Sequence, residues 1–204
     1  MAFPDISISA ELDATNQVLS AVGQAPITTL DQTNPDVSIC WDTILQCNRE
    51  VQAEGWGFNT EQHYPFTPDN DGFIYIPPNI LMLDLSDTYA NAGIEAVPRG
   101  DRLYNKYAHT YVWEDQVECD VVWLFEFKDC PLPVREYITA RAAVQASTKM
   151  TGDSTVYQML QAKEALARAN ILEFECNQND YSIFGFPEGT GYYSSYKPYK
   201  TLAR

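Results

Sequence analysis

The spacing of apolar residues changes twice along this chain, and that change limits the folds it can adopt. Towards both ends, apolar side chains recur every three or four residues, which is typical of amphipathic helices. Between Thr60 and Cys130 the apolar residues are mostly aromatic or β-branched. Clusters of Pro, Gly, Asn and Asp separate them, as in a series of short strands. The order helix, helix, strands, helix, helix predicts an α+β fold.

Four helices are expected from this spacing. The first covers residues 9–23 and closes on a glycine, which is common just past a helix end. The second covers 34–55, where Asn34 can cap the first turn and a proline follows it. The other two cover 130–150 and 154–176, with the turn sequence TGD between them.

Four segments carry the strand pattern, with the sequences HYPF, GFIYIP, RLYNKYAHTYVW and DVVWLFEF. In the last of these, large apolar residues at every second position from Val121 to Phe127 predict an amphipathic strand. The segment NILMLDL, within 77–97, fits either a short helix or a strand. The sequence PDNDGF is expected to form a hairpin turn, because the distal glutamate of a calcium loop is missing.

Helices on both sides of the strands can pack together. We expect residues 1–59 and 131–176 to form a four-helix bundle. Residues 60–130 would then form a β-rich subdomain inserted between the second and third helices. Residues 177–204 would leave the bundle as an extended C-terminal arm.

Two large aromatic residues stand among turn-forming residues where the second helix meets the strands. They could stack a ligand, or they could fill the seam between the bundle and the inserted strands. Packing is the preferred interpretation, because the chain must leave the bundle here and glycines allow the backbone to turn. We therefore expect Gly55, Trp56, Phe58 and Asn59 to form a structural junction.

The last 28 residues combine aromatic side chains with Gly, Asn, Ser and Pro, and show neither a helical nor a strand period. Their aromatic residues are Tyr181, Phe184, Phe186, Tyr192, Tyr193, Tyr196 and Tyr199. Exposed rings of this kind are costly in water, so the segment is expected to dock on something. It could fold back on its own domain; the preferred interpretation is an arm that reaches a neighbouring subunit.

Charge is distributed unevenly. The net charge of the chain is −15, and residues 1–98 contain fourteen acidic residues against one base, Arg49, which leaves −13. Proteins that grip nucleic acid cluster Lys and Arg to neutralise phosphates, and this stretch does the opposite. It either avoids nucleic acid or faces it without holding it; a solvated acidic surface that serves solubility is the simplest alternative.

Catalytic signatures are missing from the sequence. Five widely spaced cysteines form no CxxC motif, and Cys40 and Cys47 would lie about 10 Å apart on one helix, too far for a disulfide. The two histidines, His63 and His109, form no metal-binding pattern, and no nucleotide-binding or nucleophile-elbow motif occurs. We expect no cofactor, no bound metal and no enzymatic activity. With 28 acidic residues, a glycosidase-like carboxylate pair stays open as an alternative.

The chain contains no apolar run long enough to span a membrane. Its N-terminus has neither the basic nor the apolar region of a signal peptide. We therefore expect no membrane partner and synthesis in a reducing cytosol.

Several motifs together resemble the tail tubular protein A family of short-tailed bacteriophages. The resemblance covers most of residues 9–176. The first helix ends in Gly-x-x-Pro and is followed by Thr-Leu. The second helix closes in Arg-x-x-Gln-x-x-Gly-Trp-x-Phe-Asn, and the sequence PLPVREYITARAAVQ resembles the third helix of the family. In this chain the first set of motif residues is Gly23, Pro26, Thr29, Leu30, Arg49, Gln52, Gly55, Trp56, Phe58 and Asn59. The middle of the chain has diverged, and the tail is similar mainly in its tyrosine and glycine content.

The resemblance implies a structural head-to-tail adaptor in the virion tail, assembled in the cytoplasm of the bacterial host. Such adaptors form a twelve-membered ring between the portal protein and the tail nozzle, tail tubular protein B, with tail fibres attached at this level. The C-terminal arm reaches the portal, and DNA passes through the lumen without specific binding. The alternatives are a tail-associated polysaccharide hydrolase with an Asp/Glu pair and a free-standing regulatory binding module.

Overall fold

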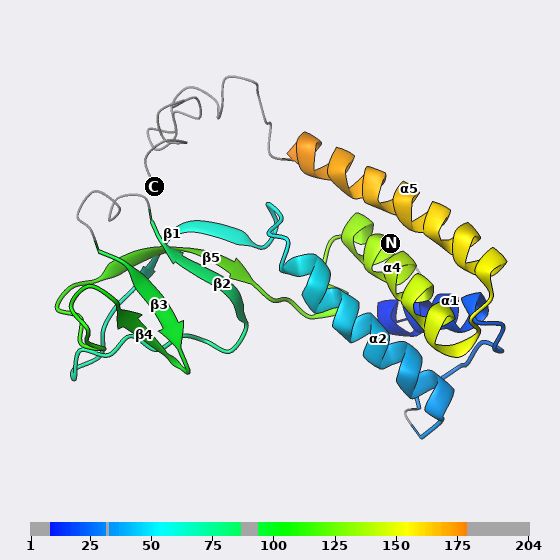
Figure 1. Ribbon diagram of the computed structural model, residues 1–204, viewed down its shortest axis with the longest axis horizontal. Coiled ribbons are helices and arrows are strands. Elements are labelled where there is room, and N and C mark those ends of the chain that lie inside the picture. Colours follow the sequence, from blue (N-terminus) through cyan, green and yellow to red (C-terminus); the bar gives the residue numbers. More distant parts are fainter. Residues whose placement is uncertain (1–8, 32, 87–93, 179–204) are drawn as a thin grey trace, which may run out of the picture.

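Four α-helices and five β-strands form within the residues that the computed structural model describes, 9–31, 33–86 and 94–178 (Figure 1). The helices are α1 (Ala10–Ala21), α2 (Pro35–Gln52), α4 (Leu132–Met150) and α5 (Ser154–Gln178), and the short 3-10 helix η1 (Phe127–Asp129) precedes α4. The strands are β1 (Thr60–Phe66), β2 (Ile80–Leu85), β3 (Ala96–Arg99), β4 (Arg102–Asn105) and β5 (Val117–Trp123). The expectation that the chain combines helices with strands is confirmed.

The first two helices begin where the sequence indicated. Ser9 caps α1, because its Oγ accepts a hydrogen bond from the backbone N–H of Leu12 at 3.2 Å. Asn34 caps α2 in the same way, and its Oδ1 accepts from the N–H of Asp36 at 3.0 Å. These side chains satisfy N–H groups that have no partner within a helix, which is why such residues mark helix starts.

Helix α4 lies at the centre of the helical part. α5, α2 and α1 each contact it, and α1 also contacts α2. Figure 1 shows α5 along one side of α4, with α1 and α2 on the other. The four helices share one hydrophobic cluster. Its fully buried members include Val18, Leu19, Ile44, Val51, Tyr137, Ile138 and Ile171.

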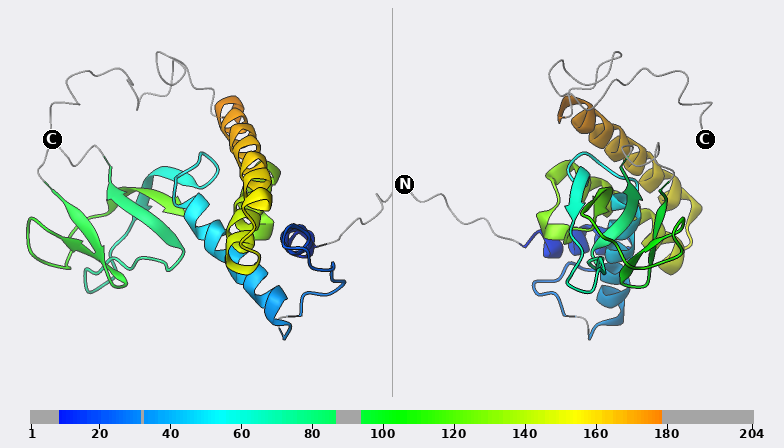
Figure 2. Two further views of the ribbon diagram at one scale, coloured as in Figure 1. Left: turned by 45° about the vertical axis from the view of Figure 1, so that its right-hand side comes forward. Right: turned by 90° about the vertical axis from the view of Figure 1, so that its left-hand side faces the viewer.

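The strands enclose a second hydrophobic cluster. β1, β5 and β2 form an antiparallel sheet with β5 in the middle, and β3 and β4 form a separate hairpin. The buried members of this cluster are Phe66, Ile74, Ala96, Leu103, Trp113, Val117, Cys119 and Val121. Figure 2 shows the strands gathered at one end of the molecule and the helices at the other.

The strand expected to continue to Phe127 ends earlier, and this expectation is corrected. β5 stops at Trp123, and Phe127 enters η1. There its ring is buried in the helical cluster, edge-on to Trp41, with ring centroids 6.4 Å apart. The apolar pattern runs past the end of the sheet because the chain passes directly from one hydrophobic cluster to the other.

Two other expected strands also differ. In GFIYIP, Phe73 and Tyr75 form only isolated bridges, to Val112 and Arg102. In RLYNKYAHTYVW, pairing is limited to β4 and further isolated bridges. The open choice for NILMLDL is decided in favour of a strand, because β2 pairs with β5 and buries one side against the second cluster.

The turn expected at PDNDGF is present, but it does not join two paired strands as a hairpin, because β1 pairs with β5 and Phe73 bridges Val112. The N–H of Gly72 donates to the carbonyl oxygen of Asp69 at 3.0 Å, and Gly72 has a φ of +82°. A Cβ at this position would lie 2.7 Å from Cγ1 of Val112. Only glycine combines this backbone conformation with so close a neighbour.

The link between helices and strands is built by a compact turn after α2. Gly55 adopts a φ of +75°, and the side chain of Trp56 then turns back into the helical cluster. Its indole N–H donates to the carbonyl oxygen of Val51 at 2.7 Å. Phe58 is half-buried against the same cluster and packs beside Phe125, with ring centroids 6.2 Å apart.

Buried amide side chains join this turn to the end of β5. Gln52 is fully buried; its Oε1 accepts from the N–H of Phe125 at 2.8 Å, and its Nε2 donates to the carbonyl oxygen of Phe125 at 3.0 Å. Asn59 donates to the carbonyl oxygens of Gln52 and Trp123, and accepts from the N–H of Trp56. Asn48 donates to the same Phe125 oxygen at 3.1 Å. These bonds hold the exit from α2 and the return from β5 together.

Replacement of Trp56 by alanine should lower the free energy of unfolding by about 3–5 kcal/mol, because a buried ring and its indole hydrogen bond are lost. Chemical denaturation monitored by circular dichroism measures this change. Tyr107→Ala, at a ring that is 74 % exposed, is the control and should leave stability unchanged. Wild-type stability in Trp56→Ala would contradict the packing role.

Asn59→Asp keeps the shape of the side chain but removes its two N–H donors. The new oxygen would face the carbonyl oxygens of Gln52 and Trp123 in a buried position. We expect a loss of at least about 2 kcal/mol in the free energy of unfolding. The exposed Asn70→Asp is the matched control. Equal melting of the two variants would show that the amide network does not hold the junction.

Candidate functional site

A group of polar and titratable side chains lies where the three-stranded sheet has an irregular register. Nδ1 of His63 lies 2.6 Å from Oγ of Ser86 and 3.3 Å from Oε2 of Glu118. The backbone N–H of His63 donates to Asp120 at 3.0 Å. His63 has a φ of +56° within the register shift of β1, an uncommon conformation for a residue with a side chain.

This group does not have the geometry of a nucleophilic relay. In such a relay the histidine uses one ring nitrogen for the nucleophile and the other for the orienting acid. Here Ser86 and Glu118 approach the same nitrogen, and Ser86 is fully buried. The contacts instead join β1, β5 and the end of β2.

The buried thiols are also poor nucleophiles. Burial raises the pKa of Cys47 and Cys119 to about 12, and that of Cys40 and Cys130 to about 11. Reactive cysteines need the opposite shift, since the thiolate is the attacking species. All five cysteines, including the exposed Cys176, are free thiols, as the sequence indicated.

A charged seam joins α2, α4 and α5. Arg141 pairs with Glu50 at 3.2 Å, and Arg168 pairs with Glu54 at 3.1 Å while donating to the hydroxyl of Tyr137 at 2.6 Å. Burial alone would raise the pKa of Glu50, but hydrogen bonds from neighbouring amides and the Arg141 guanidinium lower it overall. A general acid needs a raised pKa, and the environment of Glu50 instead stabilises its charged form for the ion pair with Arg141.

The C-terminal half of α5 is held by the same region. Beyond the Arg168–Glu54 pair, Oε1 of Glu175 accepts a hydrogen bond from the backbone N–H of Gly57 at 2.7 Å. These contacts tie α5 to the turn that contains Trp56. The orientation of α5 therefore depends on the junction.

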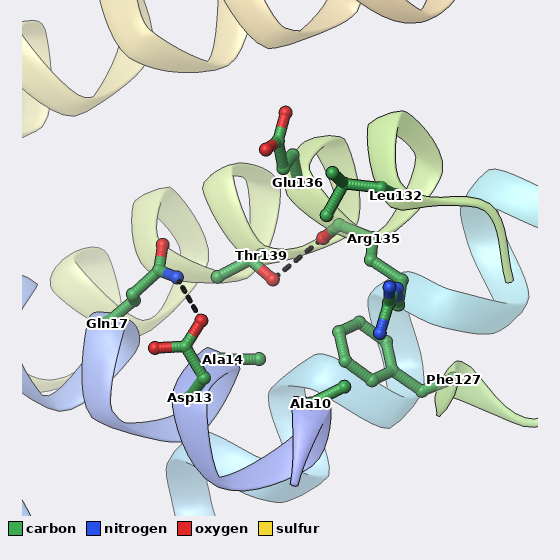
Figure 3. Close-up of a pocket in the computed structure, with 9 residues that line it drawn as sticks. All are labelled: Ala10, Asp13, Ala14, Gln17, Phe127, Leu132, Arg135, Glu136 and Thr139. Atoms are coloured by element: carbon green, nitrogen blue, oxygen red, sulfur yellow. Dashed lines mark hydrogen bonds between the residues drawn. The ribbon is translucent and has the colours of Figure 1, made fainter. Parts of the chain in front are cut away.

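An open groove of about 480 Å³ lies between α1 and α4 (Figure 3). Asp13 within it is bonded to Gln17 at 3.0 Å, and Glu136 points away from it. Arg135 lies beside the ring of Phe127, and its Nε has no hydrogen-bond partner in the described ranges. Among the residues that line this groove, none pairs a nucleophile with a base.

A second groove, of about 430 Å³, lies on α2 beside the chain that leaves β5. Its apolar lining is Trp41, Leu45, Leu124, Phe125 and Phe127. Charged residues at this groove are Glu11, Arg49 and Glu126. The apolar side chains make up most of its lining near the junction.

The residues singled out from the sequence fall into two sets. Gly55, Trp56, Phe58 and Asn59 lie together at the turn after α2. The seven aromatic residues of the expected arm lie outside the described residues. The sequence reasoning missed the α2 groove, because Leu45 and Phe125 meet only in the folded chain. The sequence pattern also did not indicate which apolar residues of the last helix face the core; Met159 and Leu166 are exposed.

The described residues contain neither a metal-binding cluster nor a membrane-spanning helix. No group of three or more His, Cys, Asp or Glu side chains is placed to hold a metal ion within those residues. None of their helices combines the length and the apolar character that crossing a membrane requires.

Comparison with known proteins gives the family that the sequence motifs resemble. The family model described as tail tubular protein matches residues 12–181. Tail tubular protein A of Klebsiella phage KP34 is 26 % identical over 172 residues, which cover 82 % of this chain and 88 % of that protein. The match spans both the helical part and the strands. The chain belongs to the tail tubular protein family.

Proposed function

We propose that this chain is a structural protein of a bacteriophage tail, a head-to-tail adaptor that forms a closed ring between portal and nozzle. The observation that carries the proposal is the family match over residues 12–181, with tail tubular protein A of a Klebsiella phage as a relative. The described residues add support, because their titratable clusters and grooves have structural rather than catalytic geometry. The resemblance in the sequence implies twelve copies in the ring.

The charge of the chain suits a channel for DNA. A passing duplex carries two phosphates per base pair, so basic groups on the wall would bind it and slow its movement. The −13 carried by residues 1–98 repels phosphates instead. In this proposal part of that acidic surface lines the lumen.

The purified chain, alone and mixed with portal protein, should form a ring that native mass spectrometry and electron microscopy detect. A reconstruction should show acidic residues from 1–98 along the lumen. A neutral or basic lumen would overturn the role assigned to the charge. A monomer that ignores portal protein would overturn the adaptor itself and favour a free-standing binding module.

Residues 177–204 are proposed as the arm that binds the portal, through the seven aromatic residues from Tyr181 to Tyr199. Their rings offer apolar area together with hydroxyl groups, a combination favoured at protein interfaces.

Deletion of 179–204, which retains all of α5, should leave the thermal melt unchanged and abolish portal binding in co-sedimentation. A full-length variant with the seven aromatic residues changed to serine separates side-chain recognition from chain length and should also fail to bind. Unchanged portal binding by both variants would show that the segment is not the portal contact.

A further inference from the structure

α5 presents a long apolar face to solvent. Of its 25 residues, Ile171 alone is classed as buried. Met159 is 70 % exposed, Leu166 is 64 % exposed and Leu172 is 46 % exposed. Seven exposed residues turned away from α4 continue this surface: Gln158, Met159, Ala162, Ala165, Leu166, Ala169 and Leu172. We call this set the α5 face.

The α5 face is a surface distinct from the one that packs on α4. Leu160, Ala167 and Ile171 contact the helical cluster. At 100° per residue, Leu166 and Ala162 lie on the far side of the helix from Ile171. The face extends from Gln158 to Leu172, about 21 Å along the helix axis.

Charge makes this face unusual for the chain. The protein carries a net charge of −15, yet none of the seven positions of the α5 face is ionisable; Glu173 lies just beyond its C-terminal end. Exposed apolar surface of this extent, free of charge, is characteristic of a contact site. Copies that each carry such a negative charge repel one another, so a contact between copies is least costly where no charge is present.

A second apolar surface lies on the opposite side of the helical part. Thr43 and Glu50 of α2 point to α4, where they bond to Lys149 and Arg141. Leu45 and the other groove residues that belong to α2 lie more than a quarter-turn around the helix from Thr43 and Glu50. Because α5 lies on the other side of α4 (Figure 1), the α5 face and the α2 groove point away from each other.

We propose that the α5 face of one copy packs into the α2 groove of the next copy around the ring. The inference rests on the proposed ring and names its subunit contact. A cyclic ring repeats one contact between two unlike surfaces, and these must lie on different sides of the subunit. The α5 face and the α2 groove meet that requirement within one chain.

The flanking charges of both signs can be matched. Lys163, on the side towards α4, and Glu173 border the α5 face; Glu11, Arg49 and Glu126 lie at the α2 groove. Neither Lys163 nor Glu11 forms an ion pair with another described residue. Opposite charges at the edge of an apolar contact favour one orientation of the partner. A second copy thus offers both the apolar surface and the charge that the α5 face requires.

The test introduces one negative charge on each surface of the full-length protein. Leu166→Glu changes the α5 face, and Leu45→Glu changes the α2 groove. Gln161→Glu adds the same charge to an exposed position of α5 outside the face and is the control. Native mass spectrometry should find rings for wild type and Gln161→Glu, and monomers for both leucine variants. Thermal melts should show that each variant is folded; Phe125→Glu replaces Leu45→Glu if the latter is not.

Mixing the two leucine variants distinguishes this contact from others. Each variant retains one intact surface, so an equimolar mixture should form one-to-one dimers and no rings. A mixture that stays monomeric would overturn the pairing of face with groove. Rings formed by Leu166→Glu would overturn the inference while leaving the adaptor in place. A wild type that never forms a ring, with or without portal, would overturn the proposed function and the inference with it.

Discussion

The arrangement of the molecule depends on a small set of buried amide hydrogen bonds at the point where helices and strands meet. Gln52 and Asn59 bond to backbone groups of Trp123 and Phe125, more than sixty residues later in the chain. A buried polar group left without a partner costs about 1–3 kcal/mol. Displacement of the strands would break several of these hydrogen bonds at once and lose that free energy at each. The network therefore fixes one orientation of the β part on the helices, and Trp56 closes the turn beneath it.

That junction also positions α5. Arg168 and Glu175 attach the helix to Glu54 and Gly57, on either side of Trp56. Elsewhere α5 contacts mainly α4, which leaves its other side in solvent. A rigid centre that carries a helix with an uncovered apolar face is suited to assembly, since the contact surface is already ordered before the partner arrives.

Charge and apolar surface have separate roles in this view. Acidic residues dominate the first 98 positions, where they favour solubility and, in the proposed ring, repulsion of DNA. In the proposed ring, the α5 face and the α2 groove are where like-charged copies would meet. In the proposed ring, assembly and passage of the genome would be served by different surfaces of one subunit.

The sequence by itself determined the order of elements, the helix cap at Asn34, the turn at Gly72 and the acidic character, because each depends on neighbours within a few residues. It also identified the family through short motifs. The tertiary structure decided where β5 ends, because Phe127 finds its burial against Trp41, far away in the chain. It also decided which apolar residues of α5 are covered: Ile171 meets α4 and Leu166 does not. Periodicity marks a helix as apolar on some side, but only its packed neighbours determine which side is left for another molecule.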